Sequence, residues 1–484
     1  MQNSAFVTKF KIGFSKFAVP AKSGFRKYEQ FVRKFIYSDY YLLLVAFFLF
    51  LGWVTRCAPL GLTMLILISF AALIASDDIL PITINIFGAA LIIYTSDISQ
   101  FLFMWPILLL LIPGFGIFIA RNIRHKFTLG KMFFPQVAVS IALLLGGAGV
   151  VAGADYLRAL PTALVLGIGV LAIYMFYNHF LKRDGRHDIP TYFSKVMMYI
   201  GIVIALELIV TILRSGVPVS QWHNEYWDLG WGNRNNVATY LILTAGLTFY
   251  LSTKSRHSWL YLAAGFFQYF CIIMTFSRGG IIFGGISGVI ALVLSIVKAQ
   301  NRKHALITTG IVLAAILVLY LAFMGKINSM IGSLLSRGMD TSGRTELYVE
   351  AWECFKAHPF LGVGMGYLGN NFDLSVANMY WFHSTLFQVI ASMGIVGIAA
   401  YVYFYVIRAY LVFKNIKHTF NLFILAIWIG FEGYCMIDAG TFVPYPNMML
   451  IIIMTLLLEV NLNNKTHLTK EVLASEYSAT KTNE

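Results

Sequence analysis

The chain has 484 residues and a formal net charge of +14, with 58% hydrophobic and only 12% charged residues, and its mean hydropathy is +0.74. Soluble domains carry about 25% charged residues, so this composition excludes an ordinary soluble protein and predicts an integral membrane protein. The four cysteines are scattered without CxxC spacing, which predicts neither a disulfide framework nor a metal site.

Residues 1–38 are basic and aromatic. Phe6, Phe10, Phe14 and Phe17 recur at helical spacing with lysines between them, which predicts an amphipathic helix lying on an anionic cytoplasmic membrane surface. No small-residue cleavage site follows a short apolar core here, so no cleavable signal peptide is predicted. Residues 39–461 are expected to form one polytopic membrane domain, and the polar residues 462–484 a cytoplasmic tail.

Fourteen apolar segments approach the length of about 20 residues that a membrane-spanning helix needs. They are 40–55, 58–76, 79–95, 101–120, 133–153, 159–177, 192–213, 236–252, 258–276, 279–297, 305–324, 384–410, 419–437 and 443–461. The sequence therefore predicts an all-α integral membrane protein with about 12–14 transmembrane helices. The long polar region 325–383 is expected to form a large outer loop that contains short helices.

Lysine and arginine are distributed unevenly between the two sides of this topology. With both termini in the cytoplasm, 27 of the 36 lie on the inner side and 9 on the outer side, as the positive-inside rule requires. Seven of the nine outer residues are arginines, whose planar guanidinium binds phosphate or carboxylate through two points. Any anion chemistry is therefore expected on the outer side.

The outer loop has two recognisable parts. Residues 344–357 have helical periodicity, and the following "HPFLGVGMG" has the proline and glycines of a shaped turn. Gly362, Gly364 and Gly366 resemble a nucleotide-binding fingerprint only superficially, because they follow a helix rather than a strand. No nucleotide or nucleic-acid partner is predicted.

Three outer arginines occupy unusual positions. Arg278, in the tight turn "FSRGG", lies near the outer membrane plane, where a charge either reaches lipid phosphates or faces a site. Arg344 begins the loop helix, where a cation opposes the macrodipole, so it needs an anionic partner: Glu346, Glu350 or a ligand phosphate. Arg234, within "GNRNN", is flanked by asparagines that can cap the next helix.

Two further arginines, Arg214 and Arg337, are weaker candidates for the same site. His383 opens a span in "WFHSTLFQ"; it is either a helix cap or a base that accepts a proton from a hydroxyl. Ser384 and Gln388 follow as possible supporting residues.

Two carboxylates, Glu207 and Glu432, fall within spans, where they suit a proton relay or, as we favour, ion pairs with nearby arginines. The sequence contains no HExxH, no paired cysteine site, no DxD-like cluster in an outer loop and no GxSxG. Neither a metal nor a cofactor is therefore predicted.

Four stretches, in this order, resemble the O-antigen ligase and O-antigen polymerase superfamily: "GWGNRNNVATYL", "MTFSRGG", "SGRTELYVEAWECFKAHPFLGVGMGYL" and "FHSTLFQVIASMGIVG". The resemblance implies a multispan glycosyltransferase of the GT-C type. Arg278 and Arg344 would hold the diphosphate of an undecaprenyl-diphosphate glycan, with Arg234 as a possible third contact, and His383 would activate an acceptor hydroxyl.

The resemblance further implies an enzyme of the bacterial cytoplasmic (inner) membrane, with the active site facing the periplasm or the exterior and no metal in the reaction. The acceptor could be a lipid A core, a growing glycan, a wall polymer or a protein, which leaves ligase and polymerase both open. A flippase or transporter of lipid-linked glycan is the alternative function. It would require charges near mid-membrane and internal repeats.

Overall fold

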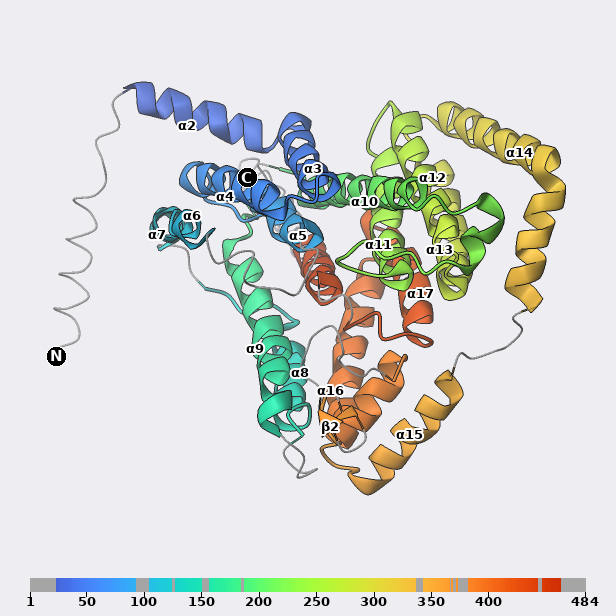
Figure 1. Ribbon diagram of the computed structural model, residues 1–484. Helices are drawn as coiled ribbons and strands as arrows, with labels where there is room; N and C mark the ends of the chain where they lie inside the picture. Colours follow the sequence, from blue (N-terminus) through green and yellow to red (C-terminus); the bar gives the residue numbers. More distant parts are fainter. Residues whose placement is uncertain are drawn as a thin grey trace, which may run out of the picture.

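The structure of the protein is a computed structural model. It describes residues 23–92, 104–123, 127–149, 156–183, 187–336, 343–365, 367–368, 371–372, 382–442 and 446–462. These residues are almost entirely helical (Figure 1). The prediction of an all-α integral membrane protein is confirmed. The phenylalanines at 6, 10, 14 and 17 and the tail after 462 lie outside the described residues.

The helices follow one another with short connections. They are α2 (Ser23–Ile36), α3 (Asp39–Val54), α4 (Ala58–Ala75), η1 (Leu80–Ile82), α5 (Thr83–Ile92), α6 (Trp105–Leu108), α7 (Leu111–Asn122), α8 (Phe133–Leu145), α9 (Tyr156–Phe180), α10 (Ile189–Arg214), η3 (Val219–Asn224), α11 (Arg234–Ser252), α12 (Ser258–Met274), α13 (Arg278–Lys298), α14 (Arg302–Ser336), α15 (Arg344–Ala357), α16 (Thr385–Lys414) and α17 (Thr419–Cys435). A last helix spans Pro446–Leu462. Two short strands, β1 (Tyr367–Leu368) and β2 (Asn371–Phe372), pair in antiparallel register.

Each of the fourteen predicted apolar segments contains helix. Within the described residues, seven helices are long and apolar enough to cross a membrane, or eight if the bent pair of α2 and α3 counts as one span. Five shorter apolar helices of 10–17 residues, from Leu80–Ile92 to Pro446–Leu462, correspond to other predicted spans. Predicted spans of similar apolar content therefore form helices of different lengths.

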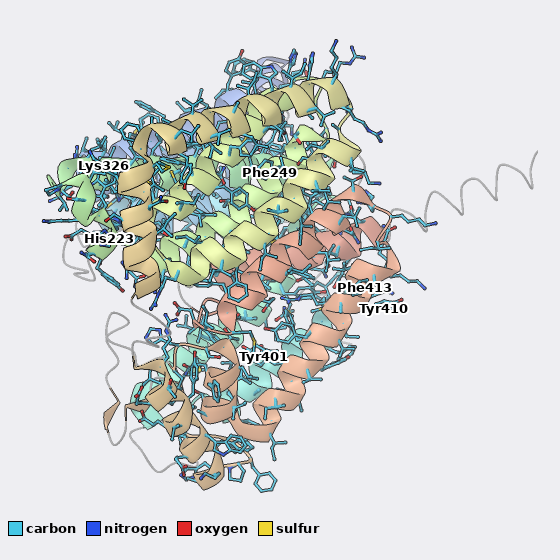
Figure 2. The ribbon with its side chains drawn as sticks, turned by 90° about the vertical axis from the view of Figure 1, so that its right-hand side faces the viewer. His223, Phe249, Lys326, Tyr401, Tyr410 and Phe413 are labelled. Atoms are coloured by element: carbon cyan, nitrogen blue, oxygen red, sulfur yellow. The ribbon has the colours of Figure 1, made fainter. Side chains whose placement is uncertain are left out.

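The start of the predicted loop is helical. The predicted loop 325–383 begins within α14, which continues to Ser336 past a non-helical residue at Phe323. This end of the helix reaches η3, and Figure 2 places Lys326 of α14 close to His223 of η3. The loop helix α15 is found where helical periodicity predicted it, and it packs on α16.

Helix α11 forms the centre of the bundle. It packs against α10, α12, α13 and α17, and every residue from Val237 to Ser252 is buried (Figure 2 shows Phe249 there). Two of its threonines bond inside the bundle: the Thr244 hydroxyl donates to Gln268 Oε1 at 2.9 Å, and Gln268 Nε2 donates to the Thr248 hydroxyl at 3.0 Å. This arrangement satisfies side chains that lipid would leave unpaired.

The outer loop is joined to a break in α16. Gly394 has φ 58° and ψ −150°, which frees backbone groups on both sides of it. The turn after α15 bonds to them: Val363 N donates to Ala391 O at 2.9 Å, Gly364 N to Ser392 O at 3.1 Å, and Ile395 N to Pro359 O at 2.8 Å. The glycine-rich turn therefore completes the backbone hydrogen bonding of a membrane helix.

Candidate functional site

The site lies where several helix ends meet. Helices α13, α15 and α16 begin there and α17 ends there, because residues at the starts of the first three helices lie beside Tyr434 or Asp438. Helix α11 begins beside α13, since Gly280 packs against Ala238. The end of α3 belongs to the same side, since Trp53 Nε1 donates to Leu229 O at 3.0 Å in the loop before α11. The predicted arginines and His383 stand at these helix ends.

Asp438, in the turn after α17, joins residues from three elements. Its Oδ1 lies 3.3 Å from His383 Nδ1, and its Oδ2 lies 3.8 Å from Arg344 Nη2. The hydroxyl of Tyr434 donates to Oδ2 at 3.2 Å, and the backbone N–H of Ala439 donates to Oδ1 at 2.8 Å. One carboxylate thus brings the predicted histidine and one predicted arginine into a single cluster.

The charges of this cluster favour the ionised form of Asp438. Burial acts to raise the pKa of this carboxyl, but the hydrogen bond and charge of His383 and the charge of Arg344 outweigh it and lower the pKa. The carboxylate side chain is 15% exposed, whereas His383 is 45% exposed. A fixed anion therefore lies beneath an imidazole that remains open to a substrate.

Arg278 is the first residue of α13, and its neighbours in the chain contact the cluster. Ser277 caps this helix by accepting from Gly280 N at 3.4 Å, and its hydroxyl lies 3.4 Å from that of Tyr434. Gly279 packs so closely that a Cβ there would come within 2.9 Å of Tyr434. The chain around Arg278 therefore touches the residue that bonds to Asp438.

The backbone of His383 is held in a strained conformation. His383 has φ 46°, and Phe276, two residues before Arg278, has φ 52°; bulky residues rarely adopt this region, and such strain concentrates at functional sites. Gln388 Oε1 accepts from Phe382 N at 3.0 Å, and the Tyr348 hydroxyl donates to His383 O at 3.1 Å. Contacts on both sides fix the histidine.

Arg234 is oriented by the loop before α11. Its Nη1 donates to Glu225 O at 2.8 Å, and its guanidinium lies 5.4 Å from the ring centre of Tyr226. Burial raises the pKa of Tyr226, Arg234 opposes this, and the charge of Asp438 adds to it. Arg234 and Asp438 thus both act on one tyrosine. The predicted cap is confirmed as well, since Asn233 accepts from the N–H groups of residues 235 and 236.

Other predicted residues lie elsewhere. Arg214, at the end of α10, donates to Val54 O at 2.9 Å. Glu346 is exposed on the first turn of α15, and Asp438 is a carboxylate that approaches Arg344. Arg337 lies outside the described residues.

The two supporting residues after His383 serve the start of α16. Ser384 caps the helix, accepting from Phe387 N at 3.5 Å, and it is fully buried. Gln388 holds the backbone before the histidine, as described above. Both residues therefore position His383 rather than face the open side of the site.

The two intramembrane carboxylates have different partners. Glu432 forms the expected ion pair with Arg408 at 2.5 Å. The expectation fails at Glu207, which accepts from Trp231 Nε1 at 2.8 Å.

Sequence reasoning missed Asp438, Tyr434 and Tyr348. The signal for Asp438 was present, because it is a lone carboxylate in "YCMIDAGTF" between two apolar segments, and such a residue is a functional candidate by default. The two tyrosines gave no comparable signal, since the chain contains 26 tyrosines. Their roles depend on three-dimensional contacts.

An apolar groove adjoins the cluster between α16 and α17. It has a volume of about 300 Å³, and Thr385, Val389, Val402, Cys435 and Met436 are among its lining residues. Thr385 and Met436 lie two residues from His383 and Asp438, so the groove opens beside the charged cluster. Tyr401, which Figure 2 labels, and Tyr405 line both this groove and a smaller cavity next to α8.

The fold and the site define a helical membrane protein whose basic and imidazole groups gather at one membrane face. Residues 262–402 match the family model described as O-antigen ligase, which confirms the resemblance over the part of the chain holding Arg278, Arg344 and His383. The matched part, residues 262–402, is therefore similar to an O-antigen ligase domain. No protein among those with curated descriptions matches the sequence.

Proposed function

We propose that the protein transfers a glycan from an undecaprenyl-diphosphate carrier to an acceptor hydroxyl on the outer face of the bacterial cytoplasmic membrane. The O-antigen ligase domain supports a membrane glycosyltransferase of the ligase or polymerase type. The observation that carries the proposal is the convergence of Arg344 and His383 on Asp438.

The arginines stabilise the leaving group. When the bond between the anomeric carbon and the diphosphate breaks, negative charge grows on the diphosphate oxygens. Arg344 and Arg278, with Arg234 as a third contact, supply fixed positive charge where that leaving group would lie. Preorganised charge of this kind lowers the barrier because it needs no rearrangement during the reaction.

His383 is the proposed base. In the tautomer that donates from Nδ1 to Asp438, Nε2 is left free to accept a proton. The acceptor oxygen gives its proton to Nε2, forms a bond to the anomeric carbon, and displaces the diphosphate from the opposite side. This in-line attack inverts the configuration at that carbon.

The groove between α16 and α17 suits the lipid part of the donor. Its lining is mainly apolar and it opens beside the cluster, so a polyprenyl chain could remain in the hydrocarbon while its diphosphate reaches the arginines. The membrane-edge position of the site follows from this division of the donor into an apolar tail and a charged head.

The test uses purified protein, an undecaprenyl-diphosphate glycan and candidate acceptors, with products identified by mass spectrometry. His383→Ala should lower transfer at least about 100-fold, and Arg344→Ala about 100-fold or more. His358→Ala and Lys356→Ala, both in the outer loop but outside the cluster, should retain activity. Full transfer by His383→Ala protein would reject the proposal.

The acceptor decides between ligase and polymerase. Transfer to a lipid A core, a wall polymer or a protein identifies a ligase, whereas extension of a second carrier-linked glycan identifies a polymerase. The flippase alternative makes a different prediction: purified protein in liposomes would move lipid-linked glycan across the bilayer and form no glycosidic bond.

A further inference from the structure

A second polar pocket lies at the opposite end of the bundle from the site. It is formed by α2, the turn between α2 and α3, the turn after α4 and the residue before the α10 cap, and it has a volume of about 710 Å³. Its lining residues are Gln30, Phe31, Arg33, Lys34, Tyr37, Ser76, Asp77 and His187. Helix α2 meets α3 at 70° beside it (Figure 1).

The parallel helices α3 and α10 show that the pocket is far from the candidate site. Helices α3 and α10 begin together, since Lys195 Nζ lies 3.0 Å from Asp39 Oδ2, and they end together at the contact between Arg214 and Val54. A helix of 26 residues such as α10 is about 39 Å long. The pocket is thus at one membrane face and the Asp438 cluster at the other.

The walls of the pocket are held by specific contacts. Arg33 Nε donates to Ala75 O at 2.9 Å, which fixes α2 to the end of α4. The rings of Tyr37 and His187 stack at 3.6 Å, and the Tyr37 hydroxyl donates to Asp78 Oδ2 at 2.6 Å. The pocket is therefore shaped by the fold before any ligand arrives.

Two of the acidic groups near the pocket have cationic partners, and the third, Asp78, is buried behind Tyr37, whose hydroxyl donates to it. Glu29 pairs with Arg121 at 2.5 Å and with Arg33 at 3.3 Å, and Asp77 lies 3.6 Å from Arg33. Lys34 is exposed at the pocket, and among the described residues no carboxylate pairs with it. The charge left over in the pocket is positive, which favours an anionic ligand.

Apolar surface beside the pocket distinguishes a lipid from a soluble anion. Phe31 is 69% exposed at its rim. On α3, Tyr40, Leu43 and Phe47 are also exposed, and their spacing puts them on one face of the helix. A ligand with a phosphate in the pocket and hydrocarbon along α3 would satisfy both surfaces.

We propose that this pocket binds the phosphate headgroup of an anionic phospholipid, with Lys34 as its main cationic contact. The acyl chains lie along the exposed face of α3. Neutral zwitterionic lipids bind less well, because their own cation competes with Lys34 for the phosphate. This inference does not depend on the glycosyltransferase reaction.

The test measures lipid binding to the full-length protein in nanodiscs of phosphatidylglycerol mixed with phosphatidylcholine, by native mass spectrometry after release. Wild type should retain phosphatidylglycerol in preference to phosphatidylcholine, and Lys34→Glu should reduce that retention about tenfold. The matched control is Lys303→Glu, an equal charge change on an exposed residue at the same membrane face, which should retain lipid as the wild type does.

Three outcomes would overturn the proposal. Lys34→Glu could retain phosphatidylglycerol like the wild type, or Lys303→Glu could lose as much, which would indicate a diffuse charge effect. Alternatively, millimolar inorganic phosphate could displace the bound lipid and protect the folded protein equally well, which would identify a soluble anion as the ligand. Glycan transfer measured on the same variants keeps this result separate from the proposed function.

Discussion

At the scale of single residues, Asp438 holds the candidate site together. It contacts His383 and Arg344 and is hydrogen-bonded to Tyr434, so one carboxylate orients the proposed base and holds one proposed diphosphate ligand. Neither His383 nor Arg344 would be fixed as well by its own helix, since the first is at a strained turn and the second begins a helix whose dipole opposes it.

Replacing Asp438 should weaken the reaction through its two neighbours. We expect Asp438→Asn to lower the rate of transfer roughly 100-fold, because the amide no longer favours the Nδ1-donating tautomer of His383 and no longer balances Arg344. The change should fall mainly on kcat, measured with saturating donor. A large rise in KM with unchanged kcat would instead place Asp438 in donor binding.

The same carboxyl gives a pH dependence of stability. Its pKa is lowered in the folded protein from an ordinary value of 3.8, so it stabilises the fold above that value, and this stabilisation is lost as the pH falls through the lower folded value. Thermal unfolding in detergent should show wild type more stable than Asp438→Asn near neutral pH. The difference should shrink below about pH 4; a gap that widens on acidification would contradict the pairing.

At the scale of elements, the sequence predicted the helices, which follow from periodicity, and missed features that depend on packing. All fourteen apolar segments contain helix, and α15 lies where its periodicity placed it. The continuation of α14 to Ser336 was missed because polar residues such as Lys326 interrupt the apolar run, although helix resumes after the non-helical residue Phe323. Arg278, Arg344 and His383 were proposed from their positions at helix ends, and the structure brings Arg344 and His383 to Asp438. Asp438 was overlooked although it is a lone carboxylate between two apolar segments.

The packing of the turn after α15 can be tested by comparing a glycine in this turn with a glycine in α13. Gly364 has φ 100°, and a Cβ there would come within 2.8 Å of Gly149 Cα. Gly364→Ala should therefore destabilise the protein by about 1–3 kcal/mol from backbone strain alone. The control is Gly285→Ala in α13, where a Cβ meets nothing within 4 Å.

Gly285→Ala should leave stability unchanged or raise it by up to about 1 kcal/mol, since alanine is the better helix former. Both variants are compared by thermal denaturation in the same detergent. Equal stability of the two would mean that the turn does not occupy its position against α8 and α16.

For the whole molecule, the arrangement has two chemically different ends. Among the described residues, Arg344 and His383 lie at one end, and the α2 pocket, Lys195 and Lys254 lie at the other. The native cysteines provide a direct test, because Cys57, in the turn between α3 and α4, is exposed, whereas Cys271, Cys354 and Cys435 are buried.

A membrane-impermeant maleimide added to intact cells, with the outer membrane permeabilised where one is present, should label Cys57, because it lies at the same end as the site. Cys57→Ser should abolish this labelling. A cysteine introduced as Lys303→Cys in that background should react only after the cytoplasmic membrane is opened. The reverse pattern of labelling would invert the proposed orientation.

The interruption of α16 at Gly394 limits how the loop before this helix can be exchanged between related proteins. Since the extramembrane turn supplies hydrogen-bond partners to the opened helix, neither segment keeps its backbone satisfied without the other. A graft that imports an outer loop from another protein, in order to change the acceptor, would need to bring the first two to three turns of the accompanying helix. Loop and helix should therefore be inherited and exchanged as one unit.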